Sequence, residues 1–357
     1  MPQVTPRKMA VCAVSAVSLF ALAGCGAEGG DRQNSAGFTE VKVASPANPP
    51  TVAAAFYTSL PQQTECAAEE ELQWMSVPLG GSAPVMQALE TGAVDAALAG
   101  SEAVIAAIRD GLDARIVYMA IDGNIQTASV LADSGIDSFD DFAGKTVGVL
   151  DLGAAYVPII KATVADAGGD PEAVTFVQVK PGSPMIAALE QGRVDVLAVS
   201  DNYAATVEAL GIDIRQISDE RFEQLGATMA LVVKNDLIEQ DPDLVVRMAR
   251  SIARCVSAAA QNPAKAVESH WNVYPETRGA SGSDGLAVQS NVLAVRAQSM
   301  TPTNGVWGST TDAKLQRRLD LAGASGVPLG DLTIEDIWTD EFLQQISDFD
   351  AAGGPVS

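Results

Sequence analysis

Histidine and cysteine, the residues most used for metal binding and covalent catalysis, are scarce in this chain of 357 residues. There is one histidine, His270, and there are four cysteines. One histidine leaves no catalytic triad and no cluster of imidazoles for a metal. The glycine-rich turns match neither a Walker loop nor a complete Gly-x-Gly-x-x-Gly pattern, so a nucleotide cofactor has no support. We therefore expect no cofactor and no metal site.

Basic residues are also few. The chain holds 22 Lys and Arg against 45 Asp and Glu, a net charge of −23. Such a balance repels nucleic acid, and we expect no nucleic-acid partner. It also gives no long-range attraction to an anionic ligand, although a local site can override the global field.

Long apolar runs are absent except near the N-terminus. Arg7 and Lys8 precede an apolar run over residues 9–24, which ends in Leu22-Ala-Gly-Cys25. A charged start, a short apolar run and small residues before a cleavage point are typical of a secretory signal. The ending resembles the bacterial lipobox, whose cysteine becomes the lipidated first residue. We expect residues 1–25 to be a lipoprotein signal, residues 26–38 a flexible tether, and the protein to be anchored to the outer face of the cell membrane by Cys25.

Two cysteines then remain for the folded part, Cys66 and Cys255. An extracytoplasmic compartment permits disulfides. Cys255 lies on an apolar helical stripe, so two buried free thiols are as compatible with the sequence as a Cys66–Cys255 bridge.

One segment occurs twice. The octapeptide Ala-Leu-Glu-Thr-Gly-Ala-Val-Asp at 88–95 returns as Ala-Leu-Glu-Gln-Gly-Arg-Val-Asp at 188–195, and Pro84 and Pro184 precede the copies by the same spacing. Proline near the start and glycine just past the end are typical boundaries of a helix, and the apolar run after each aspartate is typical of a buried strand. The spacing of one hundred residues predicts two lobes of the same α/β construction.

Strands alternate with helices of about ten residues, which predicts parallel, doubly wound sheets. We expect strands over residues 41–44, 72–77, 95–99, 116–121, 129–132, 146–150, 175–179, 196–199, 214–217 and 229–233. Helices are expected over residues 52–60, 138–143, 242–260, 263–270, 311–322 and 335–346. The predicted organisation has lobe 1 over 39–124, lobe 2 over 125–227, a return to lobe 1 over 228–350 and a disordered end over 351–357.

Three segments carry a resemblance to a known family. They are Gly-Ser-x-Pro-x-x-x-Ala-Leu-x-x-Gly-x-Val-Asp over 81–95, Asp-Ser-Phe-Asp-Asp-Phe-Ala-Gly-Lys-Thr-Val-Gly-Val over 137–149, and Trp-Thr-Asp-Glu-Phe over 338–342. The chain resembles solute-binding proteins of ABC importers, of the NMT1/THI5-like group that serves nitrate, sulfonate, taurine and thiamine-precursor transport. The resemblance implies a type II periplasmic-binding-protein fold that closes around a small molecule, has no catalytic activity, and passes its ligand to an ABC permease and ATPase complex.

The sequence departs from the group at residues 62–71, 151–156 and 200–203. The last two segments are expected in the cleft, so the ligand can differ from the best-known ones. We expect a small polar or heteroaromatic solute: a sulfonate, a pyrimidine or thiamine precursor, or an amine. The predicted turns offer no arginine and only Lys180 as a cation, which favours a neutral or amine-bearing planar molecule over nitrate.

In open α/β sheets, ligands bind beyond the carboxyl ends of the strands. That rule selects the candidate ligand-binding residues Ser45, Asn48, Gly81, Ser82, Ser101, Glu102, Asp122, Asn124, Tyr156, Gly182, Ser183, Asp201, Asn202 and Tyr203. Each has an alternative role: helix capping for the serines, packing for the tyrosines, and a solvated turn for the acids.

Two other functions fit a secreted chain of this fold class. One is a lipoprotein sensor or adhesion module, and the other is an enzyme related to pyrimidine biosynthesis. The single histidine and the secretion signal oppose the enzyme. We expect a monomer in either case.

Overall fold

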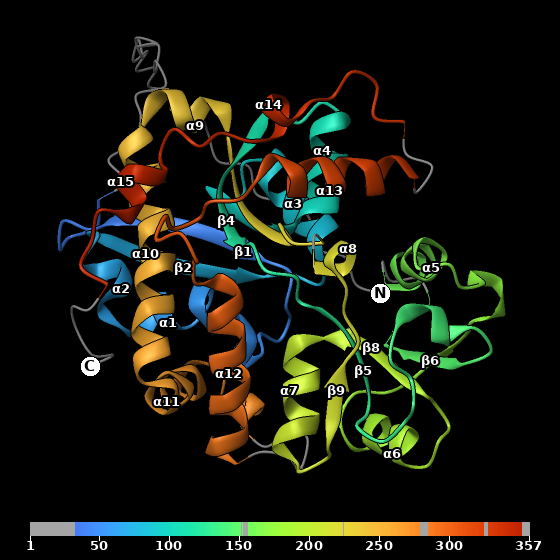
Figure 1. Cartoon of the computed structure of the whole chain (residues 1–357). Coiled ribbons are helices and arrows are strands. Elements are labelled where there is room, and N and C mark those ends of the chain that lie inside the picture. The colour runs from blue at the N-terminus through green and yellow to red at the C-terminus, as the bar shows by residue number, and fades with distance from the viewer. Residues whose placement is uncertain are drawn as a thin grey trace, which may run out of the picture. The chain divides into compact units, whose positions relative to one another are not determined.

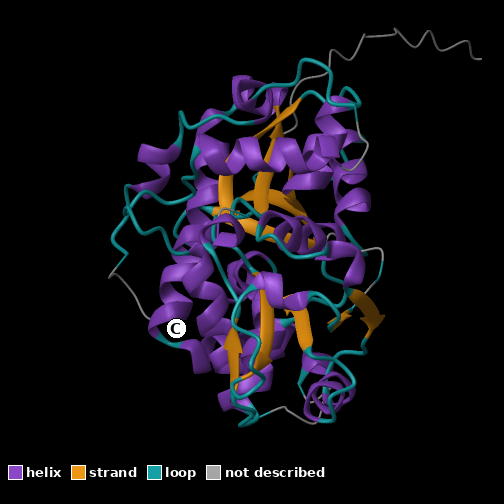
Figure 2. Cartoon of the chain, turned by 45° about the vertical axis from the view of Figure 1, so that its right-hand side comes forward, coloured by secondary structure: helices purple, strands orange, loops and turns teal. Residues whose placement is uncertain are grey.

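Two five-stranded sheets organise the chain in the computed structural model, which describes residues 33–150, 152, 156–223, 225–278, 285–324 and 328–351. Helices cover both faces of each sheet (Figures 1 and 2). The first sheet has the order β2-β1-β3-β10-β4 and the second the order β7-β6-β8-β5-β9. This α/β architecture of two sheet-based lobes agrees with the fold class predicted from the sequence.

The strands of the first sheet are β1 (Thr39–Ser45), β2 (Leu72–Pro78), β3 (Ala96–Gly100), β4 (Ala114–Ile121) and β10 (Met229–Lys234). Those of the second sheet are β5 (Gln126–Leu131), β6 (Thr146–Val149), β7 (Thr175–Gln178), β8 (Val196–Ser200) and β9 (Ile214–Gln216). The chain passes from the first sheet to the second between β4 and β5, over residues 122–125, and it returns between β9 and β10, over residues 217–228. We call these two connecting segments the first and the second crossing.

The sheets are mixed, whereas the sequence predicted parallel ones. β10 runs antiparallel to both β3 and β4, and β5 runs antiparallel to both β8 and β9. The reason is topological. The strands that are followed by a helix have their carboxyl ends on the side of the sheet that faces the crossings. β5 and β10 follow directly from the crossings, so their amino ends lie on that side and they run in the opposite direction.

The helices are α1 (Leu60–Gln63), α2 (Glu65–Ala68), α3 (Ser82–Glu90), α4 (Ser101–Arg109), α5 (Tyr156–Asp166), α6 (Ser183–Glu190), α7 (Asp201–Ala209), α8 (Glu220–Glu223), α9 (Asn235–Gln240), α10 (Pro242–Gln261), α11 (Pro263–Val273), α12 (Leu286–Met300), α13 (Asp312–Ala324), α14 (Ile334–Ile337) and α15 (Leu343–Ser347). Short 3-10 helices are η1 (Val52–Tyr57), η2 (Phe139–Phe142), η3 (Pro171–Ala173) and η4 (Pro275–Thr277). The sequence did not predict α12, which later proves central to the site.

The single helix predicted over residues 335–346 is wrong, because two short helices, α14 and α15, occupy this segment. Between them the backbone leaves the helical path and joins the first sheet. Trp338 forms a parallel bridge with Ile116 of β4, and the Thr339 N–H donates to the Ile116 carbonyl over 3.1 Å. The backbone donor that would have continued the helix is thus used by the strand.

The repeated octapeptide has the same structural role in both lobes. Gly92 and Gly192 end α3 and α6 with positive φ, at 70° and 64°. Asp95 then accepts the backbone N–H of Lys42 over 2.8 Å, and Asp195 accepts that of Thr146 over 2.7 Å. Each aspartate therefore fastens the end of its helix-to-strand turn to the neighbouring strand.

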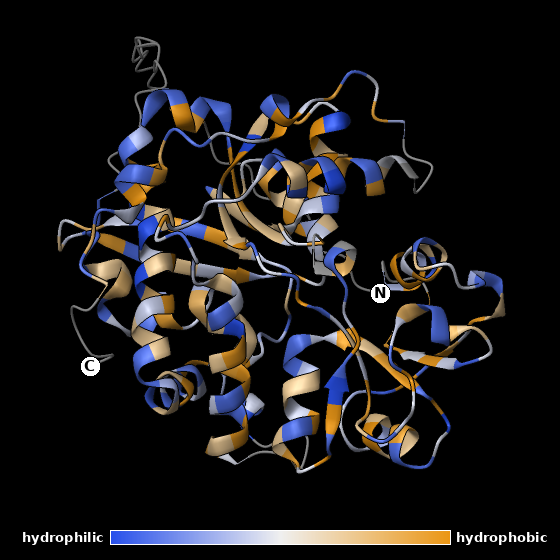
Figure 3. Cartoon of the chain, viewed as in Figure 1, coloured by the Kyte–Doolittle hydropathy of each residue, from blue (hydrophilic) through white to orange (hydrophobic). Residues whose placement is uncertain are grey.

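Apolar residues fill both faces of each sheet. In the first lobe one core lies under η1, α10, α11 and α12, and another lies under α3, α4 and α13. In the second lobe one core lies under α5 and another under α6 and α7. Figure 3 shows the strands as mostly hydrophobic and α10 as alternating between hydrophobic and hydrophilic faces. None of the helices in the described residues has both the length and the apolar character needed to cross a bilayer.

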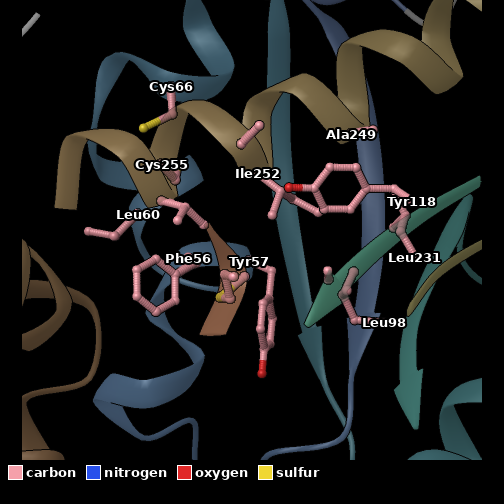
Figure 4. Close-up of a cluster of buried hydrophobic side chains, with 14 of the residues drawn as sticks. Phe56, Tyr57, Leu60, Cys66, Leu98, Tyr118, Leu231, Ala249, Ile252 and Cys255 are labelled. Carbon is pink, nitrogen blue, oxygen red and sulfur yellow. The ribbon is translucent and has the colours of Figure 1, made fainter. Parts of the chain in front are cut away.

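Cys66 and Cys255 lie in the first of these cores as free, buried thiols. Figure 4 shows them on neighbouring helices, α2 and α10. The Cys255 thiol hydrogen-bonds to Cys66, which lowers the pKa of Cys66, whereas burial raises that of Cys255. The thiols are thus neighbours, as a bridge between them would require.

Candidate functional site

The carboxyl ends of the strands, where the sequence placed the ligand, are followed directly by helices. α4 begins at Ser101, immediately after β3, and α7 begins at Asp201, immediately after β8. The repeat offset of one hundred residues makes these two positions equivalent. Their side chains nevertheless have different partners.

Asp201 forms a buried ion pair with Arg296 of α12. Arg296 Nε donates to Asp201 Oδ2 over 3.1 Å, and Nη2 donates to Oδ1. Only 6% of the arginine side chain and 9% of the aspartate side chain are exposed. Ser299, one turn further along α12, also donates to Asp201 Oδ2 over 3.1 Å. The pair therefore connects α7 of the second lobe to α12, which belongs to the part of the chain that follows the return to the first lobe.

Two tyrosines surround this pair. Burial raises the pKa of Tyr57, and the charges of Arg296 and Asp201 act on its hydroxyl. Figure 4 shows that hydroxyl pointing away from the apolar cluster that holds the ring. Burial likewise raises the pKa of Tyr156, whose hydroxyl lies beside Ser200 and Asp201. Burial lowers the pKa of Arg296, but the Asp201 carboxylate and the two phenols together raise it above its ordinary value. Both phenols are therefore neutral hydrogen-bonding groups at neutral pH.

Several buried polar atoms near the strand ends have no hydrogen-bond partner among the described residues. They include the Ser45 hydroxyl, at the end of β1, Oε1 of Gln126, at the start of β5, Oδ1 of Asp122 and the Tyr156 hydroxyl. Gln126 lies opposite Ser200 in the β5–β8 register. An unpaired buried polar group costs about 1–3 kcal/mol, so a bound partner at these atoms would be favourable. Ser45 was predicted as a site residue, and Gln126 was not.

A pocket of about 350 Å³ lies between the two lobes, next to the ion pair. It is lined by Pro49, Thr51, Val52, Pro181, Gly182, Met185, Asn202, Tyr203, Thr206, Glu276, Thr277, Val288, Gln289 and Val292. Three predicted site residues, Gly182, Asn202 and Tyr203, are among them. Val292 stands one turn before Arg296 on α12, and Asn202 follows Asp201. The pocket has the volume of a typical small-molecule site.

Four other predicted site residues hold the crossings between the lobes. Ser101 donates to the Ala227 carbonyl, and Glu102 pairs with Arg318 of α13. Asp122 pairs with Lys314 of the same helix. Each of these side chains has a partner within the chain, but Oδ1 of Asp122 is buried without a hydrogen bond. These side chains therefore hold together the segments that connect the two lobes.

Asn124 belongs to the same group. Its side chain accepts the N–H of Gln126 and donates to the carbonyl of Phe222, each over 2.9 Å. Close approach also fixes a glycine here, because a Cβ at Gly226 would stand 2.3 Å from the Asp122 carbonyl oxygen. The two crossings are thus in direct contact.

The helix starts that contain Ser82 and Ser183 differ from the capping expectation. Gly81 and Gly182, with φ of 112° and 82°, occupy the N-cap positions, and the serines are the first helical residues. Ser82 instead accepts the Gly100 N–H over 3.1 Å, which ties α3 to the end of β3. Asn48 lies in an exposed turn.

The single histidine has a structural environment. His270 is fully buried in the last turn of α11, and its Nδ1 shares a 2.8 Å hydrogen bond with the Ser59 hydroxyl. Burial lowers its pKa to about 4, so the imidazole is neutral at physiological pH.

Some predictions lie outside the described residues. They concern the signal segment with Cys25, most of the tether, most of the turn at 151–155, and the end of the chain.

Several solved structures have the same fold. The periplasmic aliphatic sulphonate binding protein SsuA from Escherichia coli aligns with a TM-score of 0.63 and 15% identity, over 85% of this chain and 98% of that one. SsuA from Xanthomonas axonopodis pv. citri, bound to MOPS, gives 0.56 and 17%, over 84% and 98%. The nitrate-binding protein NrtA from Synechocystis PCC 6803 gives 0.57 and 12%, over 87% and 88%.

Comparison with curated protein sequences gives no match. A family model described as NMT1/THI5 like matches residues 68–266, which include both copies of the repeat and the first turn of α11. The fold has two α/β lobes connected by two crossings, with a pocket between the lobes. The family model covers more than half of the sequence, and the chain therefore belongs to the NMT1/THI5-like family.

Proposed function

We propose that this protein is an extracytoplasmic solute-binding lipoprotein of an ABC importer, which captures a small molecule between its two lobes. The observation that carries the proposal is the inter-lobe pocket, whose lining comes from the β1–η1 turn, the starts of α6 and α7, and α12. A ligand there touches both lobes at once. Family membership and the likeness to sulfonate- and nitrate-binding proteins support the same role.

Binding would act through closure of the lobes about the two crossings. A ligand that contacts both lobes stabilises the closed arrangement relative to the open one, which is the general hinge mechanism. The contacts of Glu102 and Asp122 with α13 position the crossings during this movement. The closed form is then the one that an ABC permease and its ATPase would recognise.

The site has no assigned covalent step. The Asp201–Arg296 pair, the neutral tyrosines and the pocket supply binding and orientation. Lipidation of Cys25 would hold the protein at the outer face of the membrane, with residues 26–38 as the tether to the first strand.

A combined binding and scattering experiment tests this proposal. The protein without its signal is screened by thermal shift against sulfonates, pyrimidines, amines and flavins, and each hit is followed by small-angle scattering. We expect at least one hit to raise the melting temperature and to reduce the radius of gyration. An unchanged radius with every compound that binds would contradict closure, and absence of any stabilising compound would contradict solute binding.

A further inference from the structure

The charge balance at the start of α7 indicates which ligands this site accepts. A helix N-terminus and a buried arginine are both favourable places for an anion. Here Asp201, the first residue of α7, already supplies that anion, since its carboxylate binds two nitrogens of Arg296 and the Ser299 hydroxyl. The protein carries its own counter-ion where an acidic ligand would otherwise be stabilised.

Among the described residues, those that line the neighbouring pocket include no cation. Glu276 is the one charged residue among those lining it, and it lies exposed at the rim. Lys180 is exposed and lies outside the lining. The guanidinium of Arg278 lies over the Trp271 ring, 4.7 Å from its centroid. An anion in this pocket would therefore face a carboxylate, and no cation among the described lining residues would compensate for its lost hydration.

The rest of the pocket lining favours an apolar ligand. Val52, Met185, Val288 and Val292 offer aliphatic side chains, and Tyr203 offers an aromatic ring. Asn202 and Thr206 provide hydrogen bonds without charge. A volume of about 350 Å³ suits a molecule built on a single ring.

We propose that the Asp201–Arg296 pair removes anion recognition from this site, and that the ligand is a ring-sized, largely apolar molecule without negative charge, with an amine directed toward Glu276. This inference rests on the proposed solute-binding function and narrows its ligand class. It separates this chain from the sulfonate- and nitrate-binding proteins whose fold it shares.

Three probes with the same benzyl group test the charge preference in the unmodified protein. They are benzylamine, benzyl alcohol and phenylmethanesulfonate, each titrated by calorimetry, with ethanesulfonate and nitrate as further anions. We expect benzylamine to bind most tightly, benzyl alcohol next, and the three anions at least tenfold more weakly than benzylamine. Binding of any of these anions as tight as that of benzylamine would overturn the inference and leave solute binding intact.

Substitutions locate the binding. Thr206→Trp fills the pocket and should abolish benzylamine binding, whereas Glu208→Trp, on the exposed side of the same helix, should leave it unchanged. Glu276→Gln should weaken the affinity for benzylamine about two- to fivefold, as expected for the loss of an exposed ion pair. The affinity for benzyl alcohol should not change. Equal binding in Thr206→Trp and the unmodified protein would exclude this pocket.

Asp201→Asn tests the counter-ion itself. It frees Arg296 for an external anion, and we expect phenylmethanesulfonate to gain about tenfold in affinity while benzylamine loses. An Asp201→Asn protein that folds, as judged by circular dichroism, but gains no sulfonate affinity would contradict the role of the pair. Failure of every benzyl probe together with binding of another metabolite would reject the ligand class only. Failure of all compounds would reject the proposed function as well.

Discussion

The segments that follow the two copies of the repeat start from equivalent positions and do different work. After the first copy, Ser101 and Glu102 bind the second crossing and the helix beside it. After the second copy, Asp201 binds Arg296 and Asn202 lines the pocket. The shared residues thus build the same turn twice, and the positions just beyond them contact a crossing in the first lobe and a pocket in the second.

The largest effect should come from breaking the pair after the second copy. Asp201→Ala leaves Arg296 buried without its counter-ion, which we expect to cost about 3–5 kcal/mol of unfolding free energy. Urea denaturation measures it. The equivalent test on the first side, Glu102→Ala, should cost about 1 kcal/mol. The reason is that Glu102 is 40% exposed and Arg318 keeps the carbonyls of Leu225 and Gly226. Equal costs would remove the distinction between the two sides.

A disulfide between Cys66 and Cys255 would stabilise the first lobe without linking it to the second, because both cysteines lie in the first lobe. Cys66 precedes the second lobe in sequence and Cys255 follows it, so a bridge would close a covalent loop around that lobe. We expect oxidised glutathione, a disulfide donor, to convert the two thiols to a bridge with loss of two hydrogens, and to add about 2–4 kcal/mol of stability. Mass spectrometry under non-reducing conditions reads the bridge. Cys255→Ala is the control, and its stability should not respond to oxidant.

Acid should destabilise the first lobe through a group that the second lobe lacks. Burial holds the pKa of His270 at about 4, below the value of about 6.5 in an unfolded chain. The unfolded state therefore binds more protons between these values, and this contribution to stability is complete above pH 6.5. It is lost as pH falls toward 4, by about 1.4 kcal/mol per unit. Urea denaturation of the unmodified protein and His270→Gln over this range measures it. Identical pH slopes in the two proteins would contradict the assignment.

The smallest effect should come from Ser101→Ala, at the position equivalent to Asp201. It removes one buried hydrogen bond to the Ala227 carbonyl and should cost about 1 kcal/mol. Ligand affinity should stay the same, because Ser101 is not among the residues that line the pocket proposed for the ligand. Loss of affinity with unchanged stability would instead place Ser101 in the ligand site.

Most of the framework could be predicted from the sequence because its signals are local. Apolar runs in the sequence predicted the strands, and the repeated octapeptide predicted both helix-to-strand turns. Gly92 and Gly192 do have the positive φ that helix ends of this kind require. The mixed direction of the sheets was not predictable from such signals, because it depends on where the chain enters each sheet.

The site was harder to predict because its pairings are distant in sequence. Arg296 stands 95 residues from Asp201, on a helix that the sequence did not indicate. Polar residues such as Gln289 and Arg296 lie on the stripe that Leu293 and Met300 would otherwise mark as apolar. Glu102 and Asp122 were predicted as ligand groups because they follow strands. Their arginine and lysine partners on α13 could be found only from the fold.

Those partners also constrain how the molecule can move. Lys314 and Arg318 are four residues apart on α13, and they hold Asp122 of the first crossing and the carbonyls of Leu225 and Gly226 in the second. The Ala227 N–H additionally donates to the Asp122 carbonyl over 3.0 Å. Both crossings are thus bound to one helix and to each other. We therefore expect both crossings to move together with α13 in the lobe closure that we propose.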